Sequence, residues 1–135
     1  MDSLETLVEK AKKTLVPTNC IGTSLFIAGF QKQDRFKSGK NLYDSYLKGN
    51  EIEYPEKFCF VSWERLDEND SVKKVVHLGI ISEIKPLKVI SRKGRYYKGK
   101  NQDLTEEYFK EVNEIYGFLS DRIRFYANPK SNKKL

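Results

Sequence analysis

The spacing of apolar residues changes twice along this 135-residue chain, and each change limits the folds that are open to it. Residues 3–15, and later the segment that begins at Asp103, place apolar residues at the i, i+3, i+4 and i+7 spacing of an amphipathic helix. Residues 58–91 instead contain short runs rich in β-branched and aromatic residues, which favour strands. Helices followed by strands and then a helix predict an α+β fold, because alternating βαβ units would mix the two patterns.

The N-terminal part is predicted to be helical. The helix over 3–15 would be capped by Asp2 with Glu5 and stopped by Pro17. A second helix is expected from Cys20 to Ala28, after the good capping residues Thr18 and Asn19 and before Gly29. A third helical piece is expected around residues 41–48. These helices would pack on the sheet that follows.

The centre is predicted to be a small antiparallel sheet, and the C-terminal part a long helix. The strands are FCFVSW (58–63), VVHLGIIS (75–82) and LKVIS (87–91), and a further hairpin arm is expected through residues 95–97. The expected helix begins at Asp103, with Glu106 as its capping partner. Its apolar stripe is Leu104, Tyr108, Val112, Ile115, Leu119 and Ile123. We expect one domain over 1–128 and a frayed basic tail over 129–135.

Composition excludes several classes of protein. No stretch approaches the roughly 20 apolar residues of a membrane span, and MDSLETLVEKAKK lacks the apolar core of a secretory signal. The two cysteines do not form a disulfide framework, so we expect reduced thiols in a cytoplasmic protein. One histidine and two distant cysteines do not match zinc-ligand spacings, and no phosphate-binding glycine loop is present. We therefore expect no metal and no cofactor.

The net charge of +6 is concentrated in one segment. Residues 88–102 contain six basic residues and no acid, whereas the flanking parts of the chain are each neutral. Such a segment is usually a solvated turn or strand edge, where Lys and Arg also discourage edge-to-edge pairing. The alternative is a binding strip for phosphates or another polyanion, with stacking on Tyr96 and Tyr97.

Two residues are placed for nucleophilic chemistry. Cys20 opens a predicted helix, where the helix dipole and unpaired N–H groups favour a thiolate and can hold an oxyanion. His77, the only histidine, lies inside the apolar run VVHLGI and would be either a satisfied core residue or the base that takes the thiol proton. Cys59 lies in FCFVSW and is predicted to be a small core residue.

A Cys–His pair usually has a third group that orients the imidazole. The next predicted strand offers Ser91, or its neighbour Arg92, at this position. Serine is a weak orienting group, and a guanidinium cannot accept a hydrogen bond from the ring. A backbone carbonyl or a remote side chain is the alternative.

The order of these motifs resembles that of the NlpC-type cysteine peptidases, a circularly permuted branch of the papain-like fold. The resemblance covers residues 17–94 and is carried by N-C-I-G at a helix start, F-C-F-V-S-W, V-V-H-L-G-I-I-S and L-K-V-I-S-R-K-G. It implies Cys20 as nucleophile, His77 as general base and Ser91, or its neighbour Arg92, as third residue. Members usually hydrolyse amide bonds in cell-wall peptides and are exported. Asn19 stands where the family often has Asp, and Pro55-Glu56-Lys57 replaces a frequent Gly-Asp pair.

Together these patterns predict a cysteine hydrolase or acyl transferase that acts on an amide or thioester bond, with a peptide or another amide-containing molecule as its substrate. The expected substrate-binding residues are Asn19, Trp63, Arg92, Lys93 and Arg95. The alternative is a non-catalytic module of the same fold that uses residues 88–102 to bind nucleic acid or an acidic partner. The sequence carries no signal for the oligomeric state.

Overall fold

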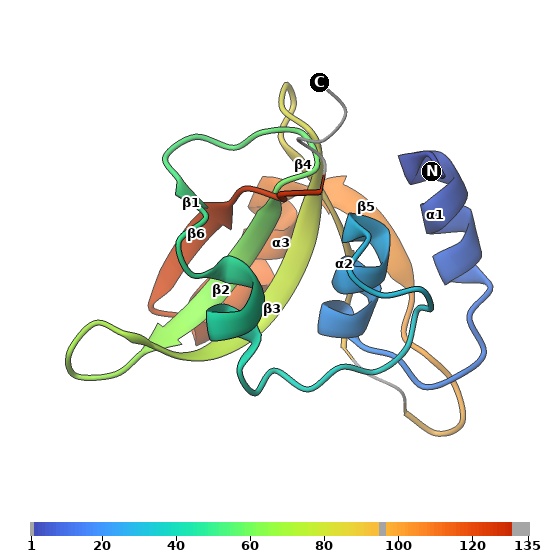
Figure 1. The fold of residues 1–135 in the computed structure, drawn as a ribbon, viewed down its shortest axis with the longest axis horizontal. Coiled ribbons are helices and arrows are strands. Elements are labelled where there is room, and N and C mark those ends of the chain that lie inside the picture. The colour runs from blue at the N-terminus through green and yellow to red at the C-terminus, as the bar shows by residue number, and fades with distance from the viewer. Residues whose placement is uncertain (1, 95–96, 131–135) are drawn as a thin grey trace.

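A six-stranded antiparallel sheet organises the chain, with strand order β1-β6-β2-β3-β4-β5. The computed structural model describes residues 2–94 and 97–130. The strands are β1 (Glu51–Ile52), β2 (Phe60–Leu66), β3 (Val72–Glu83), β4 (Lys88–Arg92), β5 (Leu104–Tyr108) and β6 (Arg122–Tyr126). The helices are α1 (Leu4–Lys12), α2 (Cys20–Ala28) and α3 (Phe109–Tyr116), with a π-helical turn at Tyr43–Leu47 and a 3₁₀ turn at Gly117–Leu119. The prediction of an α+β fold with an antiparallel sheet is confirmed (Figure 1).

The two N-terminal helices lie close to their predicted positions. The cap of α1 is Ser3, whose hydroxyl accepts a hydrogen bond from the Thr6 N–H, while Asp2 forms an ion pair with Lys10 at 2.6 Å. Asn19 caps α2 as predicted, and Gly29 ends it at φ 93°, a left-handed conformation that favours glycine. The third helical piece is reduced to the turn at Tyr43–Leu47.

The three predicted strands are confirmed as β2, β3 and β4, with bounds that differ from the predicted ones by one to three residues. Trp63 of β2 lies opposite His77 of β3, and Ile80 of β3 lies opposite Ile90 of β4. The β2–β3 register shifts directly after the first of these pairs, since Glu64 lies opposite Val75 and leaves Val76 as an extra residue. This β-bulge re-aims the side chains beside it. Arg95 and Tyr96 of the expected hairpin arm lie outside the described residues.

The predicted long C-terminal helix is wrong. Residues 104–108 form β5 on the edge of β4, residues 109–116 form the short helix α3, and residues 122–126 form β6 between β1 and β2. The apolar stripe was misleading because a spacing of four residues, as in Leu104 to Tyr108 of β5, also keeps side chains on one face of a strand. The helix α3 ends at Gly117, well before the end of the predicted helix. Residues 131–135 of the expected tail lie outside the described residues.

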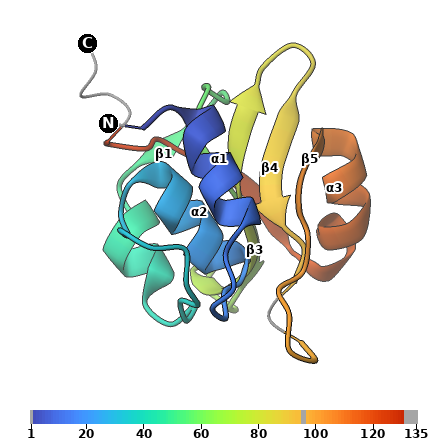
Figure 2. The same cartoon turned by 90° about the vertical axis from the view of Figure 1, so that its right-hand side faces the viewer.

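Helices cover both sides of the sheet, which gives the molecule two apolar cores. We call the side covered by α1 and α2 the α2 face, and the opposite side, covered by α3, the α3 face (Figure 2). Leu25, Phe60 and Ile80 belong to the core of the α2 face, whereas Val61, Trp63 and Val112 belong to that of the α3 face. None of the helices in residues 2–94 and 97–130 has the length and apolar character needed to cross a membrane.

Candidate functional site

Cys20 is the first residue of α2 and is 9% exposed. The Asn19 side chain accepts a hydrogen bond from the Gly22 N–H at 2.7 Å and donates one to the Lys37 carbonyl at 2.9 Å. A Cβ on Gly22 would lie 1.9 Å from the Arg35 carbonyl oxygen, so the spacing Cys20-x-Gly22 has a steric reason. Asn19, expected to contact substrate, is therefore occupied in fixing the start of the helix.

The His77 side chain lies on the α3 face and is 1% exposed. Its ring stacks on Tyr116 of α3, with centroids 3.7 Å apart and planes 4° apart, and it lies 5.4 Å from the Trp63 ring. Burial, with a smaller effect from the Lys93 charge, lowers the pKa of His77 to about 3. The imidazole is therefore neutral at physiological pH.

Ser91 contacts this ring, with its hydroxyl 3.0 Å from His77 Nε2. A hydroxyl both donates and accepts, so it satisfies Nε2 in either tautomer of a neutral imidazole. If Nε2 carries the proton and donates it to Ser91, Nδ1 is left as an acceptor that can take a proton. The structure thus brings three predicted residues, Trp63, His77 and Ser91, to one place on the α3 face.

Tyr116 and Asn113 of α3 complete this cluster, and the sequence analysis missed both. The Trp63 indole N–H donates to Asn113 Oδ1 at 3.1 Å, which fixes the indole beside the imidazole. Burial and then the charges of Cys20 and Glu107 raise the pKa of Tyr116 to about 12. Cys20 packs in the apolar core of the α2 face, whereas the His77 ring lies among the aromatic rings of the α3 face. The apolar spacing around Val112 predicted a helix here. It did not predict which strand residues this helix would cover.

Cys59 has a different environment, as predicted. It is 1% exposed and packs in the core of the α3 face. The largest influence on its thiol is burial, which raises the pKa of Cys59 to about 11. A thiol with so high a pKa is inert at neutral pH. Neither cysteine is part of a disulfide.

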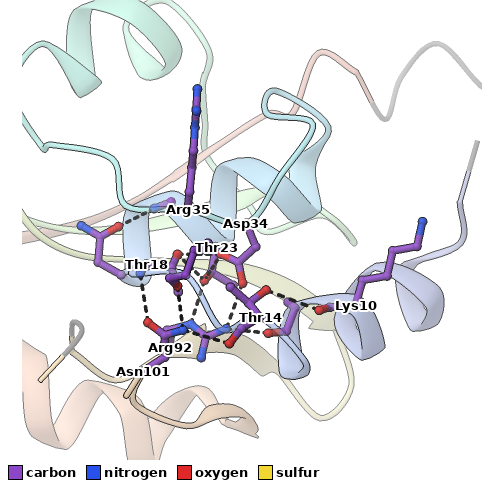
Figure 3. A network of polar contacts seen from close by, with 12 residues as sticks. Lys10, Thr14, Thr18, Thr23, Asp34, Arg35, Arg92 and Asn101 are labelled. Carbon is purple, nitrogen blue, oxygen red and sulfur yellow. Dashed lines mark hydrogen bonds and ion pairs between the residues drawn. The ribbon is translucent and has the colours of Figure 1, made fainter. Parts of the chain in front are cut away.

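Arg92 was expected in a substrate-binding strip, but it is buried on the α2 face. Figure 3 shows its guanidinium at the centre of a polar network, with an ion pair to Asp34 at 3.0 Å. It also donates to the Thr23 hydroxyl at 2.8 Å and to the carbonyls of Ala11 and Gln102 at 2.9 and 2.6 Å. The network ties α1, α2 and β4 together. Asp34 lies 58 residues away in sequence, so residue order gave no sign of this pair.

The rest of the basic segment is also partly neutralised. Lys93 forms an ion pair with Glu107 of β5 at 2.6 Å, and this contact is the first cause of the lowered pKa of Glu107. The Lys88 ammonium lies 5.5 Å from the centre of the Tyr108 ring. Arg95 lies outside the described residues. Two of the expected substrate-binding cations, Arg92 and Lys93, therefore face acids of the same chain.

Comparisons with protein families, with curated proteins and with solved structures found no match for this chain. Within residues 2–94 and 97–130, no group of three or more His, Cys, Asp or Glu side chains is arranged to hold a metal ion. The site is thus defined by its own geometry: a cysteine at a helix start, and a buried neutral imidazole held by a hydroxyl and two aromatic rings.

Proposed function

We propose that this protein is an NlpC-like, papain-type cysteine hydrolase or acyl transferase that acts on an amide or thioester carbonyl. The observation that carries the proposal is the neutral His77 ring, bonded to Ser91 and stacked on Tyr116, whose phenol also senses the Cys20 charge. Isolated core histidines need only a hydrogen-bond partner. The placement of Cys20 at a helix start, in a chain whose only histidine is held in a fixed orientation, is what favours chemistry.

In the proposed reaction the Cys20 sulfur attacks the carbonyl carbon and forms an acyl-thioester. The thiol proton passes to His77, and the imidazolium returns it to the leaving amine or thiol. Water, or an acceptor in a transferase, then gives its proton to His77 as it attacks the thioester carbonyl. The C–S bond breaks, and the imidazolium returns the proton to the departing sulfur, which restores the Cys20 thiol. A His77 pKa of about 3 keeps the resting imidazole neutral, so the ring has a free lone pair for the thiol proton.

Ser91 and Tyr116 are positioning residues in this mechanism, because they act through the imidazole. The Ser91 hydroxyl holds Nε2, and the parallel Tyr116 ring prevents the imidazole from tilting. Such stacking contributes about 0.5–1.5 kcal/mol beyond area burial. The aromatic contact compensates for the weak orienting power of a serine.

The non-catalytic alternative is less supported, because two cations of its binding strip are already paired. Arg92 is buried in an ion pair with Asp34, and Lys93 forms an ion pair with Glu107. The two functions separate in an acylation experiment with p-nitrophenyl acetate, followed by intact-protein and peptide mass spectrometry. We expect one acetyl group on Cys20 and none on Cys59, which serves as a matched thiol in the same chain. In His77→Gln the rate of acetylation should fall about 100-fold or more, as expected for loss of a general base.

Equal acetylation of both cysteines, or a Cys20 rate that does not change in His77→Gln, would contradict the enzyme. Thermal unfolding of the His77→Gln variant at pH 7.5 provides the control for folding. If acetylation contradicts the enzyme, salt-dependent binding of the protein to a polyanion would support the binding module instead. This binding should be lost when Lys98 and Lys100 are changed to Glu.

A further inference from the structure

A cavity of about 810 Å³ lies on the α2 face, beside α1 and the C-terminal half of α2. Its volume is within the range of about 300–1,000 Å³ that is usual for small-molecule sites. The apolar part of its wall includes Leu4, Leu7, Phe26, Ile27, Phe58 and Ile80. The first α2 residue in its wall, Phe26, is six positions after Cys20, or roughly 9 Å along the helix axis. The cavity is therefore separate from the candidate catalytic site.

Two exposed residues of the cavity wall are apolar as well. Leu15 and Val16, which also belong to its wall, are 89% and 52% exposed. Neighbouring exposed apolar side chains beside a cavity with an apolar wall are typical of a site for an apolar ligand rather than of ordinary surface. A nucleic acid or a polar peptide would leave these side chains uncovered.

The charged residues of the wall are unbalanced. Its two acids are already paired, Asp2 with Lys10 at 2.6 Å and Asp34 with Arg92 at 3.0 Å. The remaining lysines of the wall are Lys13, Lys32 and Lys130, and none has an ion pair with any residue that the structure describes. The Lys130 ammonium lies 5.2 Å from the centre of the Phe30 ring. The cavity thus combines an apolar interior with unpaired positive charge.

We infer that this cavity binds a single-chain anionic amphiphile of the fatty-acid class, with the hydrocarbon chain inside and the carboxylate among the lysines. A neutral lipid would leave the lysines without a counter-charge, and a small anion would leave the apolar wall in contact with water. The inference does not depend on the proposed catalysis, because it uses none of the residues near His77.

The test is a fluorescence titration of the full chain with cis-parinaric acid and, in parallel, with its methyl ester, both below their micelle concentrations. We expect saturable one-to-one binding of the acid. In Lys13→Glu/Lys32→Glu the affinity for the acid should fall at least about tenfold while that for the ester stays constant. The matched control is Lys48→Glu/Lys73→Glu, two exposed lysines outside the cavity wall, which should leave both affinities unchanged.

A second variant, Ala28→Phe, fills the cavity from α2 and should abolish binding of both the acid and the ester. If this variant does not fold, the lysine variants still test the inference, because substitution of exposed lysines leaves the core packing intact. The inference is overturned if the acid does not saturate or if acid and ester bind the wild type equally. It is also overturned if the control pair weakens binding as much as the cavity pair, or if a folded Ala28→Phe variant binds normally.

Discussion

The two faces of the sheet stabilise buried polar groups in opposite ways. On the α2 face two pairs of charged groups are bonded to each other: Arg92 binds Asp34, and the Glu64 carboxylate accepts hydrogen bonds from Arg122 and Tyr126. On the α3 face the central polar group is the neutral His77 ring, held by one hydroxyl and by aromatic rings. Permanent charges fix the elements in place, whereas a neutral base remains able to take up a proton.

Adjacent residues of one strand serve these two purposes. Ser91 contacts the imidazole on the α3 face, and Arg92 enters the ion-pair network on the α2 face (Figure 3). Successive side chains of a strand point to opposite faces, so residues next to each other in sequence can have unrelated roles. The basic segment 88–102 is therefore not one functional unit.

The largest expected effect is the loss of the α2-face charge pair. Arg92→Met leaves the Asp34 carboxylate buried without its cation, so we expect the free energy of unfolding to fall by about 3–5 kcal/mol. Lys93→Met is the matched control, because its ion pair with Glu107 is partly exposed and should contribute only about 0–1 kcal/mol. Urea denaturation measures both. Equal losses in the two variants would erase the contrast between the faces.

The next effect is a pH dependence that belongs to the α3 face. The folded-state pKa of His77 is about 3, below the ordinary value of about 6.5, so the unfolded chain binds this proton first as the pH falls. The stability from this group is complete above pH ~6.5 and declines by about 1.4 kcal/mol per pH unit as the pH falls toward 3, or about 2 kcal/mol between pH 6 and 4.5. Urea denaturation of wild type and His77→Gln across this interval should show the difference in slope. Parallel slopes would mean that the ring is not held neutral.

A smaller effect is expected for the hydroxyl that contacts the ring. Ser91→Ala leaves buried His77 Nε2 without its partner and should cost about 1–2 kcal/mol. Ser62 provides a matched control, because its hydroxyl is buried and, among the described residues, has no hydrogen-bond partner. Ser62→Ala should therefore be neutral or slightly stabilising. Because His77 is the only histidine, imidazole ¹⁵N shifts report its tautomer in each variant without assignment.

The smallest effect concerns the stacked ring. Tyr116→Leu removes the parallel contact with His77 and should cost about 1 kcal/mol of stability, whereas Tyr116→Phe keeps the stack and should cost less. The acetylation rate of Cys20 should follow the same order, with Phe close to wild type and Leu clearly slower. A Phe variant as slow as the Leu variant would show that the phenol hydroxyl, rather than the stack, supports the site.

The parts of the fold that depend on local signals were predictable from the sequence. The Asn19 cap, the Gly29 stop and the β-rich runs of β2 to β4 all lie where short-range chemistry indicated. The C-terminal part was not predictable, because β5 and β6 are defined by pairing with β4 and β2 rather than by their own apolar spacing. In the site, the Ser91 contact was foreseen from strand order. Tyr116 and the burial of Arg92 were not, since both depend on which face a distant element covers.

The adjacency of Ser91 and Arg92 also protects the sheet against misalignment. If β4 shifted by one residue against β3, every side chain of β4 would exchange faces. The guanidinium would then enter the aromatic pocket of His77 without an acid, and Asp34 would be left with a hydroxyl in place of its cation. A register slip would thus bury two uncompensated charges at once, so the sequence of β4 itself disfavours the shifted register.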